Sequence, residues 1–293
     1  MMTTEHARAS DGERGLGFRS QSLNRSRPTL ALAFEAYTRR ARQLAVLPHE
    51  GTFSIMYGSF PVPVGSGYRP GYSARPDEAG RFPVILVLPG IRGLRSYEKD
   101  LCRRLARRGF ACLAIDLYPG SGGDAVEERF SAYASRSDRA ILSEIDEAHE
   151  FLESEDVFWA IPDRCGLLGL DVGGRFALIV GATRPWARAA AIVSTPLTGD
   201  EDREFQVANM LNHLGVPVLG LYGSADSLVA AETIDAAQDR NQTGQWLLYD
   251  GAGHDFFDDG SPDYDAAAAG DADSRITKFF EATLPKPETV DLG

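Results

Sequence analysis

The stretch that most constrains the fold runs from Arg164 to Leu178, with the sequence RCGLLGLDVGGRFAL. It begins as an apolar run typical of a buried strand and ends with the composition of a helix. Between these parts lies the turn Gly169-Leu170-Asp171-Val172-Gly173. Glycines two positions before and after a central residue let a chain turn sharply from strand to helix, and the G-x-S-x-G spacing holds a nucleophilic side chain above the strand end. Here the central residue is Asp171.

Short apolar runs alternate with helical patterns along most of the chain. The expected strands are 84–88, 111–115, 164–168, 189–193, 216–222 and 245–249. The expected helices are 96–108, 125–153 with a break near Arg136, the segment from the elbow to about 183, 201–213, 229–239 and 265–282. Such alternation predicts parallel β-α-β units, and therefore an α/β protein with one doubly wound, mostly parallel sheet.

The two ends of the chain differ from this central part. Residues 1–27 are polar and rich in Arg and Ser, which predicts a disordered tail, whereas 28–50 has the apolar spacing of a helical extension. Segments 52–57 and about 60–68 predict short strands or an edge hairpin, because prolines exclude the second from a central position. We expect a loop over 74–83, one domain over 51–284 and a loose tail over 285–293.

Composition narrows the classes of partner. Acidic residues outnumber basic ones by 42 to 30, and the net charge of −12 argues against nucleic acid and anionic membranes as partners. No apolar run reaches the ~18 residues that span a bilayer. Cys102, Cys112 and Cys165 lack C-x-x-C spacing, which favours a reduced, cytoplasmic setting. We expect a small-molecule substrate and a monomer or homodimer.

The sequence also predicts that the protein uses no metal or cofactor. No His/Cys cluster has metal-ligand spacing, and no G-x-G-x-x-G or P-loop pattern follows the first parallel strand.

Three side chains follow three of the expected strands: Asp171, Asp226 and His254. Sites in open parallel sheets form beyond the carboxyl ends of the strands, so these side chains are expected to meet. Taken alone, a loop aspartate is usually a turn former, and a lone histidine is usually structural. Their order of nucleophile, acid and histidine is that of the α/β-hydrolase fold. The sequence therefore predicts this fold with a triad-like cluster.

The chain resembles the dienelactone hydrolase family over about residues 52–284. VILVLPGIRGLRSYEKDLCRRLARRGFACLAIDLYPG (84–120) resembles the family's first strand, loop, helix and "A-x-DLY" strand end. LLGLDVGGRFAL resembles its "G-x-C-x-GGR" elbow, YGSADSLV its "G-x-x-D" acid, and GAGHDFF its "AGH-x-FF" histidine segment. The resemblance implies a cofactor-free hydrolase with Asp171, Asp226 and His254 at the catalytic positions.

Two positions depart from the family pattern. The family nucleophile is Cys, or Ser in relatives, where this chain has Asp171. The glutamate that helps to activate the cysteine would fall near Leu88-Pro89-Gly90 and is absent. The changes are consistent with each other, because a carboxylate with an ordinary pKa of about 3.9 needs no activation at neutral pH.

Aspartate at this position favours covalent chemistry on a saturated carbon or an epoxide. Attack would give an alkyl ester of Asp171, which water activated by His254 would hydrolyse. The backbone N–H groups of Val172 and Ile91 are the expected oxyanion donors. Haloalkane dehalogenases and epoxide hydrolases of this fold react through such an ester. The stretch "D-x-GGR" also resembles the elbow of fluoroacetate dehalogenases.

Other reactions remain open. Attack on an ester or lactone would give a high-energy mixed anhydride, so Asp171 would act there as a general base. Lyase, isomerase or cyclase chemistry with Asp171 as acid or base is a further alternative, as is an inactive ligand-binding protein.

Several side chains near the expected site have two interpretations. Arg92 and Arg95 can bind a substrate carboxylate or be solvated, and Tyr118 can donate a proton or pack in the core. Residues 194–215 are too few for a large cap, so we expect the N-terminal helix and the loop around 120–136 to cover the pocket.

Overall fold

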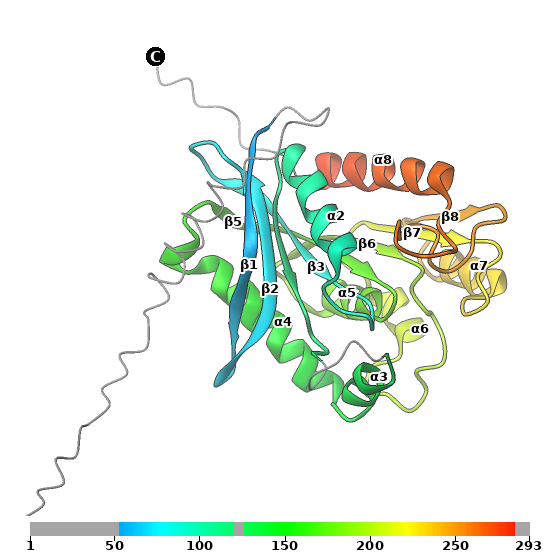
Figure 1. Ribbon diagram of the computed structural model, residues 1–293. Coiled ribbons are helices and arrows are strands. Elements are labelled where there is room, and N and C mark those ends of the chain that lie inside the picture. Colours follow the sequence, from blue (N-terminus) through cyan, green and yellow to red (C-terminus); the bar gives the residue numbers. More distant parts are fainter. Residues whose placement is uncertain (1–52, 120–125, 285–293) are drawn as a thin grey trace, which may run out of the picture.

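The computed structural model describes residues 53–119 and 126–284, which build one eight-stranded sheet (Figure 1). Across the sheet the strands lie in the order β1 (Ile55–Val64), β2 (Gly67–Pro76), β4 (Ala111–Ile115), β3 (Phe82–Leu88), β5 (Ala160–Leu170), β6 (Ala187–Val193), β7 (Val218–Gly223) and β8 (Gln245–Tyr249). β1 and β2 pair antiparallel, as do β2 and β4, and all other neighbours are parallel. The predicted doubly wound, mostly parallel α/β sheet is confirmed.

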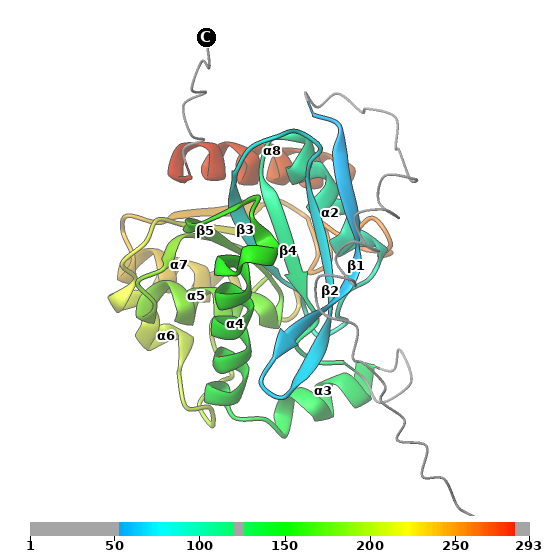
Figure 2. The ribbon, with the colours of Figure 1, turned by 90° about the vertical axis from the view of Figure 1, so that its left-hand side faces the viewer.

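Helices cover both faces of the sheet (Figures 1 and 2). One face packs against α2 (Ser96–Arg107) and α8 (Ala266–Thr283), and the other against α4 (Asp138–Glu153), α5 (Val172–Thr183) and α7 (Ala231–Arg240). β3 contributes alternate side chains to the two cores, and each of them is fully buried. Burial on both faces explains why the central strands are continuous apolar runs.

The expected edge hairpin forms at the start of the sheet as β1 and β2, but its turn and the start of the next loop were misplaced. The hairpin turns at Gly65, inside the segment expected as the strand 60–68, and Gly65 has a positive φ of 52°. The expected loop 74–83 begins as strand, since β2 continues to Pro76 and Ala74 pairs with Cys112 of β4. The proline-containing strand β1 lies at the edge of the sheet, as the missing N–H of proline requires.

The expected helix 201–213 was also wrong in its first half. Only α6 (Val207–Met210) and the short 3₁₀ helix Leu211–His213 form there. The preceding residues are held in a turn because Arg203 forms an ion pair with Asp138 and Asp200 accepts from the N–H of Val207. The predicted break near Arg136 is confirmed, since α3 (Val126–Ala134) ends just before it and Ser137 caps α4.

The remaining expectations concern the periphery. Between β6 and β7 the chain forms only α6 and one 3₁₀ turn, so no large cap is inserted at this position. The predicted tail 1–27, helical extension 28–50 and C-terminal tail 285–293 lie outside the described residues. Within the described ranges, no helix has the length and apolar character needed to cross a bilayer.

Candidate active site

The turn between β5 and α5 holds Asp171 in an unusual backbone conformation, with φ 48° and ψ −126°. This region of backbone space is costly for residues other than glycine, and such strain is tolerated where the surrounding structure enforces it. The flanking glycines permit it. A Cβ at Gly169 would lie 2.3 Å from the Cα of Gly174, and one at Gly173 would lie 2.1 Å from the carbonyl oxygen of Leu88. The elbow therefore depends on glycine at both positions.

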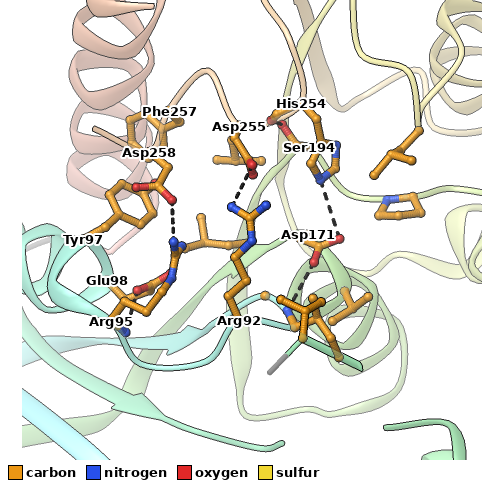
Figure 3. Close-up of a pocket in the computed structure, with 18 of the residues that line it drawn as sticks. Arg92, Arg95, Tyr97, Glu98, Asp171, Ser194, His254, Asp255, Phe257 and Asp258 are labelled. Carbon is orange, nitrogen blue, oxygen red and sulfur yellow. Dashed lines mark hydrogen bonds and ion pairs between the residues drawn. The ribbon is translucent and has the colours of Figure 1, made fainter. Parts of the chain in front are cut away.

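The carboxylate of Asp171 points its two oxygens at different partners (Figure 3). Oδ2 accepts a hydrogen bond from the N–H of Ile91 at 3.2 Å, and the backbone N–H of Val172 also acts to lower the pKa of this carboxyl. Oδ1 lies 3.8 Å from Nε2 of His254. Of the two N–H groups expected as oxyanion donors, that of Ile91 thus binds a carboxylate oxygen of Asp171 itself.

His254 and Asp226 are in direct contact. Nδ1 of His254 lies 2.8 Å from Oδ2 of Asp226. The other oxygen of Asp226 accepts from the N–H groups of Leu228 and Val229, at 2.7 and 3.1 Å, and the Asp226 side chain is fully buried. A carboxylate fixed in this way orients the imidazole so that Nε2 faces Asp171. The structure therefore brings the three predicted side chains together, and their catalytic roles stay predictions.

Burial and neighbouring charges change the pKa values of this cluster. Burial raises the pKa of Asp171, although the Ile91 N–H and the His254 charge act in the opposite direction. Burial alone would lower the pKa of His254, but the hydrogen bond and charge of Asp226, with the charges of Asp171 and Asp255, outweigh it and raise that pKa. Both shifts are typical of groups at functional sites.

Asp171 and His254 line a cavity of 460 Å³. Its floor comes from β5, β6 and α5, and its sides from the loop of residues 89–95 after β3, the loop of residues 250–265 after β8, and α3. Val126 and Phe130 of α3 therefore lie in the region that we expected to cover the pocket, and the expected N-terminal helix is outside the described residues.

The predicted substrate-binding residues lie in different environments. Arg92 and Arg95 line the cavity, where Arg92 forms an ion pair with Asp255 and Arg95 with Glu98 and Asp258. Tyr118 is only 1% exposed and is not among the residues that line the cavity. It packs edge-on against Tyr133, which agrees with its interpretation as a core residue.

Arg175, the arginine of the "D-x-GGR" stretch, points away from this cavity. It forms buried ion pairs with Asp138 at 2.7 Å and with Asp200 at 3.2 Å. Arg175 therefore has a structural role, in ion pairs behind the elbow.

Sequence reasoning missed Ser194, which follows β6 and lines the cavity. Its φ of 49° is positive, and its hydroxyl donates a hydrogen bond of 2.5 Å to the carbonyl oxygen of His254. Ser194 thereby ties the end of β6 to the loop that carries the histidine. Its position directly after an apolar strand was the available signal.

The comparisons with known proteins identify the family and the fold. Residues 70–284 match the dienelactone hydrolase family. The chain belongs to the dienelactone hydrolase family. A "Putative carboxymethylenebutenolidase" of Methylorubrum extorquens is 32% identical over 77% of this chain and 81% of its own length. A "Probable 2-oxo-3-(5-oxofuran-2-ylidene)propanoate lactonase" of Bradyrhizobium is 32% identical over 63% of this chain and 77% of its own.

Solved structures show the same fold. A "Putative Dienelactone Hydrolase" from Klebsiella pneumoniae superimposes with a TM-score of 0.71 and 26% identity, over 78% of this chain and 98% of that one. A dienelactone hydrolase from Anabaena variabilis gives a TM-score of 0.62 with 20% identity, over 78% and 99%. The predicted family and α/β-hydrolase fold are confirmed, and the chain is a hydrolase of this family.

In this dienelactone hydrolase family member no cysteine lines the cavity. Cys102, Cys112 and Cys165 are free and buried, and burial raises the pKa of Cys165 to about 12. Within residues 53–119 and 126–284, no group of three or more His, Cys, Asp or Glu side chains is arranged to hold a metal ion. The side chain at the nucleophile position of the elbow is therefore that of Asp171, and its carboxylate lines the cavity.

Proposed function

We propose that this hydrolase displaces a leaving group from a saturated carbon or opens an epoxide, with Asp171 as covalent nucleophile. His254 activates water, and Asp226 orients His254. The observation that carries the proposal is the orientation of the Asp171 carboxylate. Oδ2 accepts from the N–H of Ile91, while Oδ1 is directed toward His254 and the cavity.

In the first step Oδ1 attacks the substrate carbon. An O–C bond forms, the bond to the leaving group breaks, and the leaving group departs with its electron pair, or stays attached as an alkoxide when an epoxide opens. No oxyanion develops on a carbonyl in this step. No substrate oxygen needs the N–H of Ile91 in this step. The hydrogen bond from that N–H to Oδ2 can therefore stay in place and hold the nucleophile in position.

In the second step water cleaves the alkyl ester. Nδ1 of His254 contacts Asp226, so Nε2 is the free base, and at 3.8 Å from Oδ1 it is beyond direct hydrogen-bonding distance. Nε2 removes a proton from water, which attacks the carbonyl carbon of Asp171. The negative charge develops on Oδ2, where the N–H of Ile91 stabilises it, and this mechanism takes the N–H of Val172 as the second donor. As the intermediate collapses, the imidazolium of His254 gives its proton to the departing alkoxide, which leaves as the alcohol. Asp171 remains as a carboxylic acid and returns to the carboxylate by losing its proton to solvent.

The same contact disfavours direct attack on an ester. A substrate carbonyl oxygen needs the N–H groups that Oδ2 already occupies, so it would develop charge without them. Attack by Asp171 would also produce a mixed anhydride rather than a stable ester.

Hydrolysis of a lactone or ester is the second candidate, favoured by the names of the relatives. In that reaction Asp171 would act as a general base on water, and no bond would form between the protein and the substrate.

One labelling experiment separates the two routes. The enzyme, in excess, reacts with styrene oxide or 1-bromohexane in ¹⁸O water for a single turnover, and the Asp171 peptide is analysed by mass spectrometry. The covalent route puts ¹⁸O into Asp171 and leaves ¹⁶O in the product alcohol. Product that carries ¹⁸O, with Asp171 unlabelled, would refute it in favour of general-base catalysis.

Asp171→Cys and Asp171→Asn provide the matched controls. Asn removes the nucleophile with little change in size, so no alkyl-enzyme should form. Cys restores the family's thiol, and hydrolysis of p-nitrophenyl acetate by this variant would show that the remaining machinery can support ester chemistry. Turnover of a lactone panel by the wild type, without any reaction on epoxides or haloalkanes, would favour the second candidate.

A further inference from the structure

The cavity has two chemically different walls (Figure 3). One is charged and comes from the loop after β3, the start of α2 and the loop after β8. Its charged side chains are Arg92, Arg95, Glu98, Asp255 and Asp258, and the rings of Tyr97 and Phe257 lie beside them. The other is apolar and includes Val126, Phe130, Val172, Pro196 and Leu228. The difference between the walls bears on which substrates fit.

Arg95 forms ion pairs with two carboxylates of the protein. Its Nη2 lies 2.9 Å from Glu98 and its Nη1 lies 2.8 Å from Asp258. The two carboxylates are almost completely buried, with side-chain exposures of 2% and 6%. If Arg95 turned to bind a substrate carboxylate, it would leave two buried anions without their counterion, which is strongly unfavourable.

Arg92 is neutralised in a similar way. Its Nη1 lies 2.8 Å from Oδ2 of Asp255, whose charge also acts on Asp171 and His254. Together with Asp171, four carboxylates line the cavity against two guanidinium groups. The charged wall therefore offers no unpaired cation to an anionic ligand, and its excess charge is negative.

The apolar wall is unusually exposed. Val126, Phe130 and Leu228 have exposures of 41%, 57% and 66% although they are large hydrophobic residues. All three line the same cavity. Apolar side chains that gather at the mouth of a cavity are typical of a site that buries the apolar body of a ligand.

We propose that this pocket binds neutral electrophiles with an apolar body and rejects organic anions. In this proposal Asp255 and Asp258 determine the selectivity, because they neutralise the arginines that would otherwise attract a carboxylate. That the ligand is an electrophile rests on the function proposed above. The preference for neutral over anionic ligands does not depend on the reaction.

Binding of two unreactive ligands tests the proposal without any turnover. Phenylacetamide and phenylacetate share an apolar ring and differ in charge, and their dissociation constants are measured by calorimetry at neutral pH. We expect phenylacetate to bind at least about tenfold more weakly than phenylacetamide. Repulsion between its carboxylate and the excess negative charge of the wall is large enough to change the dissociation constant by about this factor. Equal or tighter binding of phenylacetate, or no binding of phenylacetamide, would overturn the proposal.

Substitutions in the charged wall test whether its carboxylates cause the difference between phenylacetate and phenylacetamide binding. Asp255→Asn removes the carboxylate that pairs with Arg92, and Asp258→Asn removes one of the two that pair with Arg95. Both variants should therefore tighten phenylacetate binding severalfold and leave phenylacetamide nearly unchanged. Asp255 is the more exposed of the two, so its variant keeps the test valid if Asp258→Asn does not fold. Asp163→Asn, at the exposed opposite end of β5, changes the net charge equally and should leave the ratio of the two constants as in the wild type.

A shift of the same size in Asp163→Asn would show that overall charge, and not the wall, sets the ratio. Failure of the ¹⁸O experiment would leave the binding result untouched, so the two proposals fail separately.

Discussion

At the scale of single residues, Asp226 sets both the direction in which His254 faces and the pH at which it titrates. Its Oδ2 lies 2.8 Å from Nδ1 of the histidine, and its Oδ1 is held by two backbone N–H groups. Burial acts to lower the pKa of His254, and the contacts with Asp226 are the largest of the effects that raise it. Loss of this one charge should therefore change the pH dependence as well as the rate.

We predict that Asp226→Asn slows hydrolysis of the alkyl-enzyme by roughly 10³–10⁴-fold, the loss typical of removing a histidine-orienting carboxylate. Hydrolysis needs the unprotonated imidazole, so the wild-type rate rises with pH through the raised pKa of His254. In the variant that pKa falls, and the midpoint of the rise should move to lower pH. Single-turnover rates across a pH series measure both effects, with Asp239→Asn on exposed α7 as the charge control. An unchanged midpoint would contradict the role of Asp226.

At the scale of elements, the elbow depends on close approach between α5 and the end of β3. A Cβ at Gly173 would lie 2.1 Å from a backbone oxygen of Leu88, and a backbone atom cannot give way as a flexible side chain can. Movement there would also displace the following loop, which carries the Ile91 N–H.

Gly173→Ala should therefore reduce the free energy of unfolding by about 2 kcal/mol or more, as overpacking does, and abolish turnover. Gly270→Ala is the matched control, because a Cβ at Gly270 in α8 meets nothing within 4 Å. That variant should stabilise the protein by roughly 0.5–1 kcal/mol, since alanine favours a helix interior. Urea denaturation measures both. Similar stabilities for the two variants would show that the elbow tolerates a side chain.

The elements that sequence predicted well are those whose patterns are local. The apolar runs of β3 to β8, the glycines around Asp171 and the positions of Asp226 and His254 after their strands were all visible in short windows. The turn at Gly65 was missed because valine, proline and glycine there fit either a strand or a turn. The segment 201–206 was missed because its conformation depends on Asp138, a partner more than 60 residues away.

The pairing of Arg92 and Arg95 with carboxylates could not be predicted for the same reason. Asp255 and Asp258 are more than 150 residues distant in sequence, and only the sheet topology brings their loop beside the loop after β3. A sequence shows which arginines follow a strand, and it does not show whether their charge is already compensated.

At the scale of the whole molecule, a buried ion network joins the elements behind the candidate site. Asp138, at the start of α4, pairs with Arg175 of α5 at 2.7 Å and with Arg203 of the segment after β6 at 2.6 Å. Arg175 also contacts Asp200, which accepts from the N–H of Val207 at the start of α6. The Asp138 side chain is completely buried, so its removal would leave Arg175 inside the protein with an incomplete set of partners.

We predict that Asp138→Ala lowers the free energy of unfolding by about 3–5 kcal/mol, as expected when one partner of a buried ion pair is removed. Burial alone would raise the pKa of Asp138, but hydrogen bonds from Arg175 and the Phe205 N–H outweigh it and lower that pKa. The stabilisation is therefore complete above the ordinary aspartate pKa of ~3.9 and is lost as the pH falls through the lowered value.

Thermal unfolding of the wild type and of Asp138→Ala at neutral and acidic pH tests this, and the gap between them should narrow only below pH ~3.9. Glu204→Ala breaks the exposed pair with Arg139 and should cost no more than ~1 kcal/mol, because solvent screens that contact. Equal losses of unfolding free energy in the two variants would mean that the buried ion pairs of Asp138 stabilise the protein no more than the exposed pair does. The larger loss in Asp138→Ala would show that the buried network contributes strongly to holding α4, α5 and the segment after β6 together.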